Sequence, residues 1–192
     1  MKVVAINGSP RKRGNTYFSL QKVMDILKAE GIKTELVQLG GLDVHGCRAC
    51  FKCFDRKDRK CHGPKDDMQK VIDKVLEADG VLIGSPVYFG SVSTEVKALI
   101  DRAGLVSKAN DDALARKVGA AVISVRRQGA VTTFNQINQF FLINLMIVPG
   151  SIYWNLAIGR EPGQVLDDEE GMRTMEELGK NMAWLLKKIH GH

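Results

Sequence analysis

The sequence predicts an α/β protein with a doubly wound, five-stranded parallel sheet and helices on both faces. Apolar runs of strand length alternate along the chain with segments of helical period. Most of these runs are apolar throughout, as expected for strands that are buried on both sides. Strands that alternate with helices form parallel sheets, and the handedness of their crossovers leaves a doubly wound open sheet. Its ligands should bind beyond the carboxyl ends of the strands.

In the first half of the chain, two expected strands flank one helix. KVVAIN (2–7) reads as a buried strand, and a turn with Gly and Pro leads into an amphipathic helix over about 15–30, which closes at Gly31. KTELVQL (33–39) alternates polar and apolar residues, as a strand nearer the sheet edge does. A further helix is expected over about 66–78, with two aspartates at its positive end.

The second half of the chain continues the alternation. The helix expected over 93–103 opens with a capping pattern, because Glu95 shortly follows serine and threonine. The last helix has an acidic start, a basic end and a methionine-rich apolar face, which predicts packing in the core. The other elements expected here are strands over 80–86, 117–125 and 151–159 and helices over about 132–146 and 168–189.

Length and composition predict one globular domain over 1–192, with a Cys-rich insertion at about 45–65. The 192 residues are 44% apolar and 26% charged, without linker or repeat. No apolar run approaches the roughly 20 residues of a membrane-spanning helix, and the run 3–6 is too short for a signal peptide. We therefore expect a cytoplasmic protein. The net charge of +6, with no nucleic-acid motif, favours an anionic cofactor or a small acidic protein over nucleic acid.

A phosphate-binding loop is expected at NGSPRKRGNT (7–16), directly after the first strand. Its glycines, short polar side chains, three basic residues and the following helix N-terminus are suited to an anion. Asn15 stands where a nucleoside triphosphate loop needs Lys, and G-x-G-x-x-G is lacking. A monophosphate, such as that of a flavin mononucleotide, therefore agrees best. An incidental surface turn is the alternative.

The segment SPVYFGSVS (85–93) should form the opposite lip of the same crevice. An apolar and aromatic loop at this edge can enclose a flat ring system. Gly90 would let backbone N–H groups approach the polar edge of the ring and stabilise charge on a reduced flavin. Two aromatic side chains packed into the core are the alternative interpretation.

GSPRKRGNT and GSPVYFGSVS…KALIDR together resemble the flavodoxin-like NADPH-dependent FMN reductases and multimeric flavodoxins, and the cysteine segment resembles that of iron–sulfur flavoproteins. The likeness extends through 125–155 to the C-terminus. It implies a flavodoxin-like sheet of order 2-1-3-4-5, FMN as cofactor, NAD(P)H as a candidate donor, and a homodimer or homotetramer. By this resemblance, Ser9, Arg11, Asn15 and Thr16 hold the FMN phosphate, Pro86, Val87, Tyr88, Phe89 and Gly90 hold the isoalloxazine, and Arg127 and Gly129 belong to a third contacting loop.

All four cysteines lie in CRACFKCFDRKDRKC (47–61), with the pattern C-x2-C-x2-C-x7-C. Three thiolates at successive spacings of three can wrap one face of a cubane, and the fourth arrives from farther along. Zinc more often takes two separated pairs. We expect a [4Fe–4S] cluster, with free or reversibly paired thiols and zinc as alternatives. The expected ligands are Cys47, Cys50, Cys53 and Cys61.

The same segment carries six basic side chains and two aspartates, a net charge of +4. Nearby cations would favour the reduced form of an anionic cluster. They would also steer an acidic electron carrier such as ferredoxin.

Together these features predict an FMN-dependent electron-transfer oxidoreductase. Electrons would arrive singly at the cluster, pair on the flavin and reduce a small acceptor, with no catalytic side chain required. One alternative is a clusterless NAD(P)H-dependent FMN or quinone reductase. An alternative of another class is a flavodoxin-like carrier or a thiol or zinc redox sensor. FFLINLMIV (140–148) is apolar enough to contribute to a subunit interface, and a buried helix-to-strand junction is the alternative interpretation.

Overall fold

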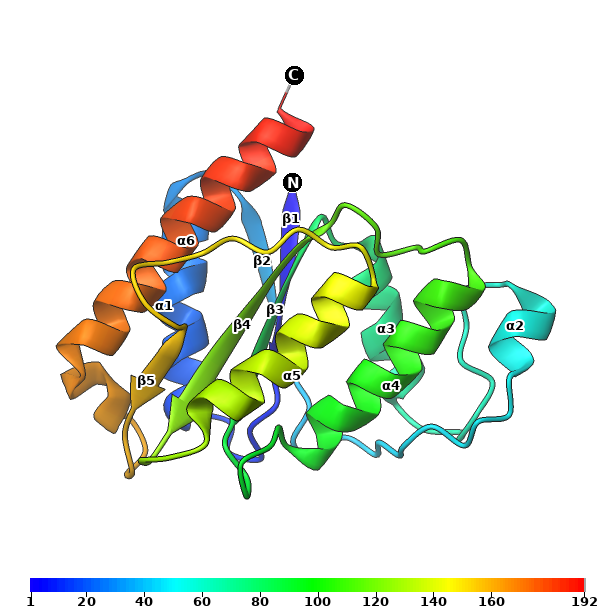
Figure 1. Ribbon diagram of the computed structural model, residues 1–192, viewed down its shortest axis with the longest axis horizontal. Helices are drawn as coiled ribbons and strands as arrows, with labels where there is room; N and C mark the ends of the chain where they lie inside the picture. Colours follow the sequence, from blue (N-terminus) through cyan, green and yellow to red (C-terminus); the bar gives the residue numbers. More distant parts are fainter. Residues whose placement is uncertain (192) are drawn as a thin grey trace.

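Five parallel strands form the central sheet of the protein. They are β1 (Lys2–Asn7), β2 (Lys33–Gln38), β3 (Gly80–Pro86), β4 (Val118–Val125) and β5 (Leu156–Ile158). The structure is a computed structural model, and it describes residues 1–191 (Figure 1). The strand order is β2-β1-β3-β4-β5, which confirms the predicted fold. In such a sheet the chain reverses its winding direction between β1 and β3, which places the ligand crevice at their carboxyl ends.

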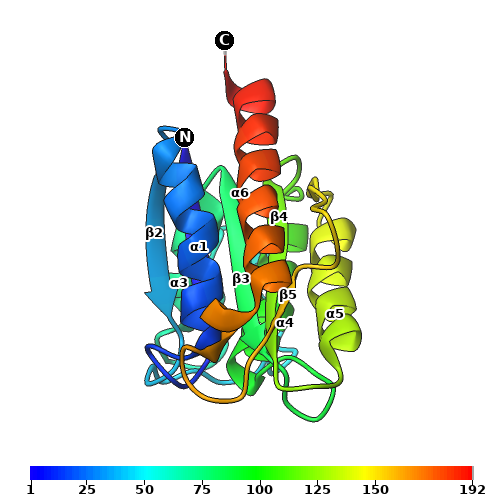
Figure 2. The same cartoon turned by 90° about the vertical axis from the view of Figure 1, so that its left-hand side faces the viewer.

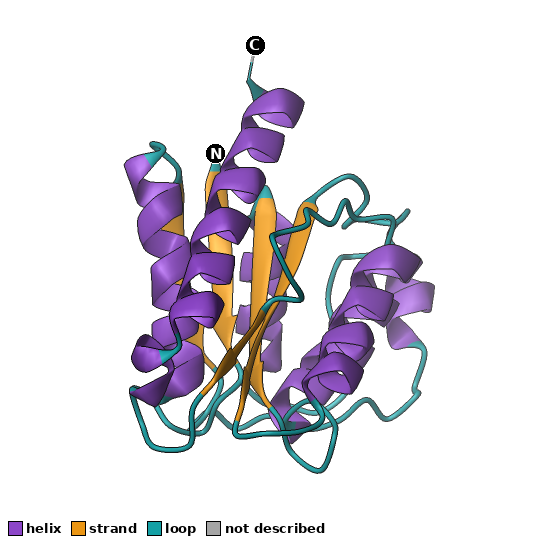
Figure 3. Cartoon of the chain, turned by 60° about the vertical axis from the view of Figure 1, so that its left-hand side comes forward, coloured by secondary structure: helices purple, strands orange, loops and turns teal. Residues whose placement is uncertain are grey.

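Helices cover both faces of the sheet (Figures 2 and 3). They are α1 (Asn15–Ala29), α2 (Lys52–Arg56), α3 (Met68–Glu77), α4 (Thr94–Ala109), α5 (Ala130–Ile143) and α6 (Glu169–His190), with the 3-10 helix η1 (Gln164–Asp167) before the last. The helices α1 and α6 pack on one face, and α3, α4 and α5 pack on the other. The short helix α2 lies outside this layer, beside α4 and at the opposite end of the molecule from β5 (Figure 1).

Burial on both faces explains why most strands read as unbroken apolar runs. In β1, Val3 and Ala5 belong to the core under α1 and α6, whereas Val4 and Ile6 belong to the core under α3, α4 and α5. The edge strand β2 is mostly half-buried, with Val37 as its one buried residue. Its alternating sequence follows from this position.

The last strand is much shorter than predicted. Only 156–158 of the expected 151–159 form β5, and they pair with Ile123–Val125 of β4. Farther along that edge, Ile147 already exchanges backbone hydrogen bonds with the chain at Lys117 and Gly119. Ile147 thus takes the start of the β4 edge, and residues 151–155 meet β4 through the Asn155 carbonyl, which accepts from the Ile123 N–H at 2.9 Å, in spite of their β-favouring composition.

Other differences concern helix ends. α4 continues to Ala109 rather than ending near residue 103, because Val106 and its neighbours are buried. The expected cap is present: the Ser93 hydroxyl accepts a hydrogen bond from the Val96 N–H at 3.4 Å. α5 begins and ends slightly earlier than predicted, and α2 was not expected.

The carboxyl ends of the parallel strands lie at one edge of the sheet, at the bottom of Figure 1. The loops 8–14, 39–67, 87–93 and 126–129 leave from this edge. Within residues 1–191, no helix is long and apolar enough to cross a membrane.

Candidate functional site

The loop after β1 lies tightly against the neighbouring strand β3. The Gly8 N–H donates to the Gly84 carbonyl at 2.8 Å. A Cβ on Gly8 would stand 2.1 Å from Cγ2 of Val96 and 2.8 Å from that carbonyl, so only glycine allows this approach. The loop is further held by the Ser9 carbonyl, which accepts from the Gln38 side-chain amide at 2.6 Å. These contacts fix the loop across β1, β2 and β3.

The N-terminus of α1 opens into this loop without a side-chain cap. The N-cap residue is Gly14, and no side chain accepts a hydrogen bond from the first turn. A Cβ on Gly14 would stand 3.1 Å from Cβ of Arg11 and 3.5 Å from Oγ of Ser9, inside the concave face of the loop. An uncapped helix N-terminus with free N–H groups and a positive dipole end is suited to an anion. The Ser9 hydroxyl and the exposed Arg11 are placed beside it.

Asn15 has a bridging role that the sequence did not reveal. Its Nδ2 donates to the Gly159 carbonyl at 2.9 Å, and its Oδ1 accepts from the Gly163 N–H at 2.8 Å. Both side-chain atoms therefore bind the segment after β5, while the backbone N–H remains at the helix N-terminus. The Thr16 side chain is 1% exposed and packs toward Gly84.

The loop after β3 forms the opposite lip as a tight turn. Tyr88 and Ser91 exchange two backbone hydrogen bonds, each 2.9 Å long. The two central residues, Phe89 and Gly90, have φ values of 49° and 76°, as a type I′ turn requires. The Ser85 hydroxyl braces the base by accepting from the Ser93 N–H at 3.0 Å. The Phe89 ring is fully exposed at the tip.

A polar hollow of about 230 Å³ lies between these two lips. Both predicted loops contribute to it, so the crevice expected from the sheet topology is present. Its walls are formed by Ser9, Arg11, Gly14, Asn15, Thr16, Pro86, Val87, Tyr88, Ser124, Arg126, Gly159 and Arg160.

Four of these wall residues were missed in the sequence. Ser124 and Arg126 stand at the end of β4, and Gly159 and Arg160 follow β5. The rule that ligands bind at the carboxyl ends of parallel strands could have identified both segments. Arg11, Arg126 and Arg160 together bring three exposed guanidinium groups to one hollow, which favours a phosphate ligand.

The third predicted loop borders a neighbouring, more open hollow. Arg127 lines a space of about 430 Å³ together with Val87 and Arg126, both of which also line the polar hollow. Gly129 approaches the turn after β3 closely, because a Cβ there would lie 3.0 Å from Cα of Gly90. Phe89 and Gly90, which were predicted to contact the ring, line neither hollow. The two hollows thus have Val87 and Arg126 as a common wall.

The four cysteines lie on the segment that connects β2 to α3 and includes α2. Cys53 is buried, Cys47 and Cys61 are half-buried, and Cys50 is exposed. Left-handed backbone at Ala49 and Phe51 alternates with the cysteines, with φ values of 49° and 53°. Backbone that alternates in this way directs N–H groups into one concavity, a form found at phosphate and iron–sulfur sites.

Three of the thiols are close enough to influence one another. Burial raises the pKa of the Cys53 thiol above its ordinary value of 9.0; two backbone N–H groups act against this, and the charges of Cys61 and Cys50 raise it further. Within residues 1–191, no three Cys, His, Asp or Glu side chains converge on a point that one metal ion could occupy. A cubane gives each of its four irons one thiolate, so its ligands surround a volume instead. Four thiols and an N–H-lined loop agree with such a group in number and kind.

A buried ion pair lies between α4 and the cysteine segment. Arg102 of α4 donates to the Asp66 carboxylate at 2.5 Å, and both side chains are 0% exposed. Burial acts to raise the pKa of Asp66, but the Arg102 guanidinium and two backbone N–H groups outweigh it and hold the pKa below the ordinary 3.8. The Nε of Arg102 donates to the Cys61 sulfur at 3.2 Å.

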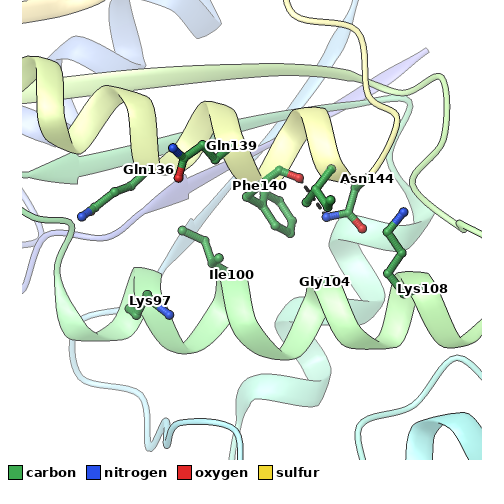
Figure 4. A pocket seen from close by; sticks show the side chains of 9 residues that line it. Lys97, Ile100, Gly104, Lys108, Gln136, Gln139, Phe140 and Asn144 are labelled. Carbon is green, nitrogen blue, oxygen red and sulfur yellow. Dashed lines mark hydrogen bonds between the residues drawn. The ribbon is translucent and has the colours of Figure 1, made fainter.

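A separate groove of about 510 Å³ lies between α4 and α5 (Figure 4). Ile100 and Phe140 form its apolar floor, and Lys97 and Lys108 stand toward its two ends. It connects to the site through Gln136, whose side-chain oxygen accepts from the Ser91 hydroxyl and the Val92 N–H, each at 3.0 Å. The segment 140–148, which contributes Phe140 and Ile143 to the groove, exposes Leu142, Ile143, Leu145 and Ile147.

The comparisons with known proteins agree with this geometry. Residues 1–161 match the family model of the NADPH-dependent FMN reductases. The chain is 38% identical over 196 residues to an iron–sulfur flavoprotein of Methanocaldococcus jannaschii, covering 98% of this chain and 99% of the relative. It is 34% identical over 191 residues to an iron–sulfur flavoprotein of Methanosarcina thermophila, covering 98% of this chain and 97% of the relative.

Solved structures show the same fold at low identity. RosB with a bound formylated riboflavin phosphate intermediate has a TM-score of 0.76 at 16% identity, covering 98% of this chain and 80% of that chain. A flavodoxin from the domain Archaea has a TM-score of 0.63 at 14% identity, covering 97% of this chain and 99% of that chain. Both matches extend over the whole sheet described above.

Proposed function

The chain belongs to the iron–sulfur flavoproteins of the NADPH-dependent FMN reductase family and is a flavin-dependent oxidoreductase, and on this premise we propose that it transfers electrons between a [4Fe–4S] cluster and FMN. The cluster would take up single electrons from a carrier such as ferredoxin, and the flavin would supply electron pairs to a small acceptor. The observation that carries the flavin half of this proposal is the polar hollow at the uncapped N-terminus of α1.

The phosphate of FMN is held, in this proposal, by the loop after β1. The Ser9 hydroxyl, the Arg11 guanidinium and the backbone N–H groups of Asn15 and Thr16 surround it. Arg126 and Arg160 extend the predicted set, since both line the same hollow. Three guanidinium groups and a helix dipole would balance the phosphate charge.

The isoalloxazine lies, in this proposal, along the turn after β3 and the adjoining hollow. Pro86, Val87 and Tyr88 offer apolar contact, and the N–H groups of Phe89 and Gly90 are available to the polar edge of the ring. Arg127 and Gly129 close the site from the loop after β4. FMN supplies storage of one or two electrons, and these residues bind it, orient it and stabilise negative charge.

The cluster is assigned to Cys47, Cys50, Cys53 and Cys61. The four thiols match its ligand number, and the alternating left-handed backbone at Ala49 supports an N–H-lined loop around it. The six basic residues nearby are all exposed, so they are available to an acidic carrier. They are Arg48, Lys52, Arg56, Lys57, Arg59 and Lys60.

Assembly and setting form the outer part of the proposal. The exposed apolar side chains of 140–148 support a homodimer or homotetramer. We propose one domain over 1–192, with the cysteine segment inserted between β2 and α3, and a cytoplasmic setting in which thiols stay reduced.

Anaerobic purification with measurement of FMN, iron, sulfide and zinc tests the proposal. We expect about one FMN and about four iron and four sulfide per chain, as a single cubane requires. Protein that contains FMN but no iron would favour the alternative function, a clusterless NAD(P)H-dependent reductase. Reduction of the bound FMN by NAD(P)H would then test that alternative. Zinc in place of iron, with no turnover with any donor, would favour the redox sensor. Protein that does not bind FMN would overturn the proposal entirely.

A further inference from the structure

Arg102 joins the two ends of the cysteine segment to α4. Its Nη1 donates to the His45 carbonyl at 3.0 Å, just before the first cysteine, and to the Asp66 carboxylate at 2.5 Å, just after the last. Asp66 in turn accepts from the His45 N–H at 2.9 Å. One buried guanidinium thus holds the base of a loop whose ends are 21 residues apart in sequence.

The same guanidinium reaches a candidate cluster ligand. Its Nε donates to the Cys61 sulfur at 3.2 Å, although the two residues are 41 positions apart. Cys61 is the ligand separated from the others by the longest spacer, so the pattern of the first three cysteines does not place it. The hydrogen bond from the buried Arg102 side chain fixes the position of Cys61 instead.

Arg102 also has donor capacity that the protein leaves unused. Among residues 1–191, its Nη2 is buried and has no hydrogen-bond partner. Leaving a buried charged donor without an acceptor is costly, and native structures seldom do so without a reason. The acceptor should therefore be a group outside the chain, located beside Cys61.

We infer that Arg102 is a positioning residue for the proposed cluster: it fixes the Cys61 sulfur and directs its free Nη2 N–H groups toward the cluster's sulfur atoms. The inference rests on the proposed function. Hydrogen bonds to the sulfurs and a nearby buried charge both favour the more negative, reduced state. Arg102 therefore raises the reduction potential of the cluster, and Asp66 keeps the guanidinium in place.

The test compares Arg102→Gln with Arg102→Lys and with a control, Lys97→Gln. Lys97 lies on the same helix, is exposed and pairs with Asp101, so its loss removes one paired charge without touching the cysteines. Each protein is purified anaerobically, and three quantities are measured: FMN and iron content, the cluster midpoint potential in an EPR-monitored titration, and the rate of iron release to a chelator.

We expect Arg102→Gln to lower the midpoint potential and to release iron about tenfold faster or more, since loss of an outer-shell partner commonly costs 10–100-fold in metal affinity. FMN content should stay unchanged, and Lys97→Gln should match the wild type. Arg102→Lys keeps the charge but cannot donate to Cys61 and Asp66 at the same time, as a guanidinium can. Its midpoint potential should therefore stay near the wild-type value, whereas its rate of iron release should rise.

Wild-type rates and potentials in both Arg102 variants would overturn the inference, whereas the proposed function would stand. If Arg102→Gln does not fold, Arg102→Lys decides, and unchanged iron release in that variant overturns the inference. Wild-type protein with FMN but without iron would refute the cluster itself and this inference with it.

Discussion

Replacing Gly8 by Ala tests whether the close approach of the loop after β1 to β3 and α4 shapes the proposed phosphate-binding hollow. The added Cβ would lie 2.1 Å from Cγ2 of Val96 and 2.8 Å from the Gly84 carbonyl oxygen. Val96 is fully buried in the first turn of α4, and its β-branched side chain has few alternative rotamers. The loop after β1 must therefore shift away from β3.

The expected magnitude follows from overpacking. Extra methyl groups in a packed interior cost about 1–3 kcal/mol. For a chain of this length, each kcal/mol lowers Tm by about 2–4 °C, so Gly8→Ala should lower Tm by about 2–12 °C. The shift should also displace the groups that are proposed to bind the FMN phosphate. Loss of one charge-assisted hydrogen bond, about 1.5–3 kcal/mol, would weaken FMN binding about tenfold or more.

The assay combines thermal unfolding of the FMN-free protein with fluorescence titration by FMN. Gly150→Ala is the matched control, because a Cβ at Gly150 meets no atom within 4 Å. The double variant Gly8→Ala/Val96→Ala removes the closest clash, so its destabilisation should be about 0.5–3 kcal/mol smaller than the sum of the single variants. The reasoning is refuted if Gly8→Ala matches Gly150→Ala in Tm and in FMN affinity.

Three further predictions concern the other groups. Arg126→Gln should raise the FMN dissociation constant about tenfold, because a charge-assisted phosphate contact is lost, whereas the exposed Arg173→Gln on α6 should not; equal effects in a fluorescence titration would contradict the assigned hollow. Cys53→Ala should abolish iron binding in elemental analysis but retain FMN, and joint loss of both would argue against separate sites. Hydrogen bonds from two lysines hold the pKa of Glu35 below its ordinary 4.5. The stabilisation that Glu35 provides is therefore present above about pH 4.5 and is lost as the pH falls below it. In urea unfolding at several pH values, the free energy of unfolding should consequently fall less steeply with decreasing pH in Glu35→Gln than in the wild type.

Most of the fold could be predicted because its information is local. Strands buried on both faces, such as 2–7 and 80–86, carry unbroken apolar runs, and their alternation with helices determines the sheet type. The segment 151–155 has equally strand-like residues and still forms a loop. Its conformation depends on which part of the neighbouring edge is free, and Ile147 already pairs with the start of β4, at Lys117 and Gly119. The residue pattern of one segment does not show which other segment pairs with the same strand edge.

The candidate site divides in the same way. Ser9 and Arg11 lie in a loop whose glycines and helix start mark it as anion-binding, so they were predicted. Arg126 and Arg160 carry no such spacing, and only the sheet order brings them to the hollow. Arg102 lies 41 residues from Cys61 and reads as an ordinary helix surface residue. Its burial, and hence its role, depends entirely on tertiary packing.

The two hydrogen bonds of the Asn15 side chain have a consequence for when the protein can bind its flavin during synthesis. This side chain joins the start of α1 to Gly159 and Gly163, contacts spanning 144 and 148 positions. While a ribosome is still making the chain, everything up to β4 can emerge before these partners exist, since synthesis proceeds from the N-terminus. Loading with flavin should consequently be a late event, and truncated chains that end before residue 159 should remain colourless.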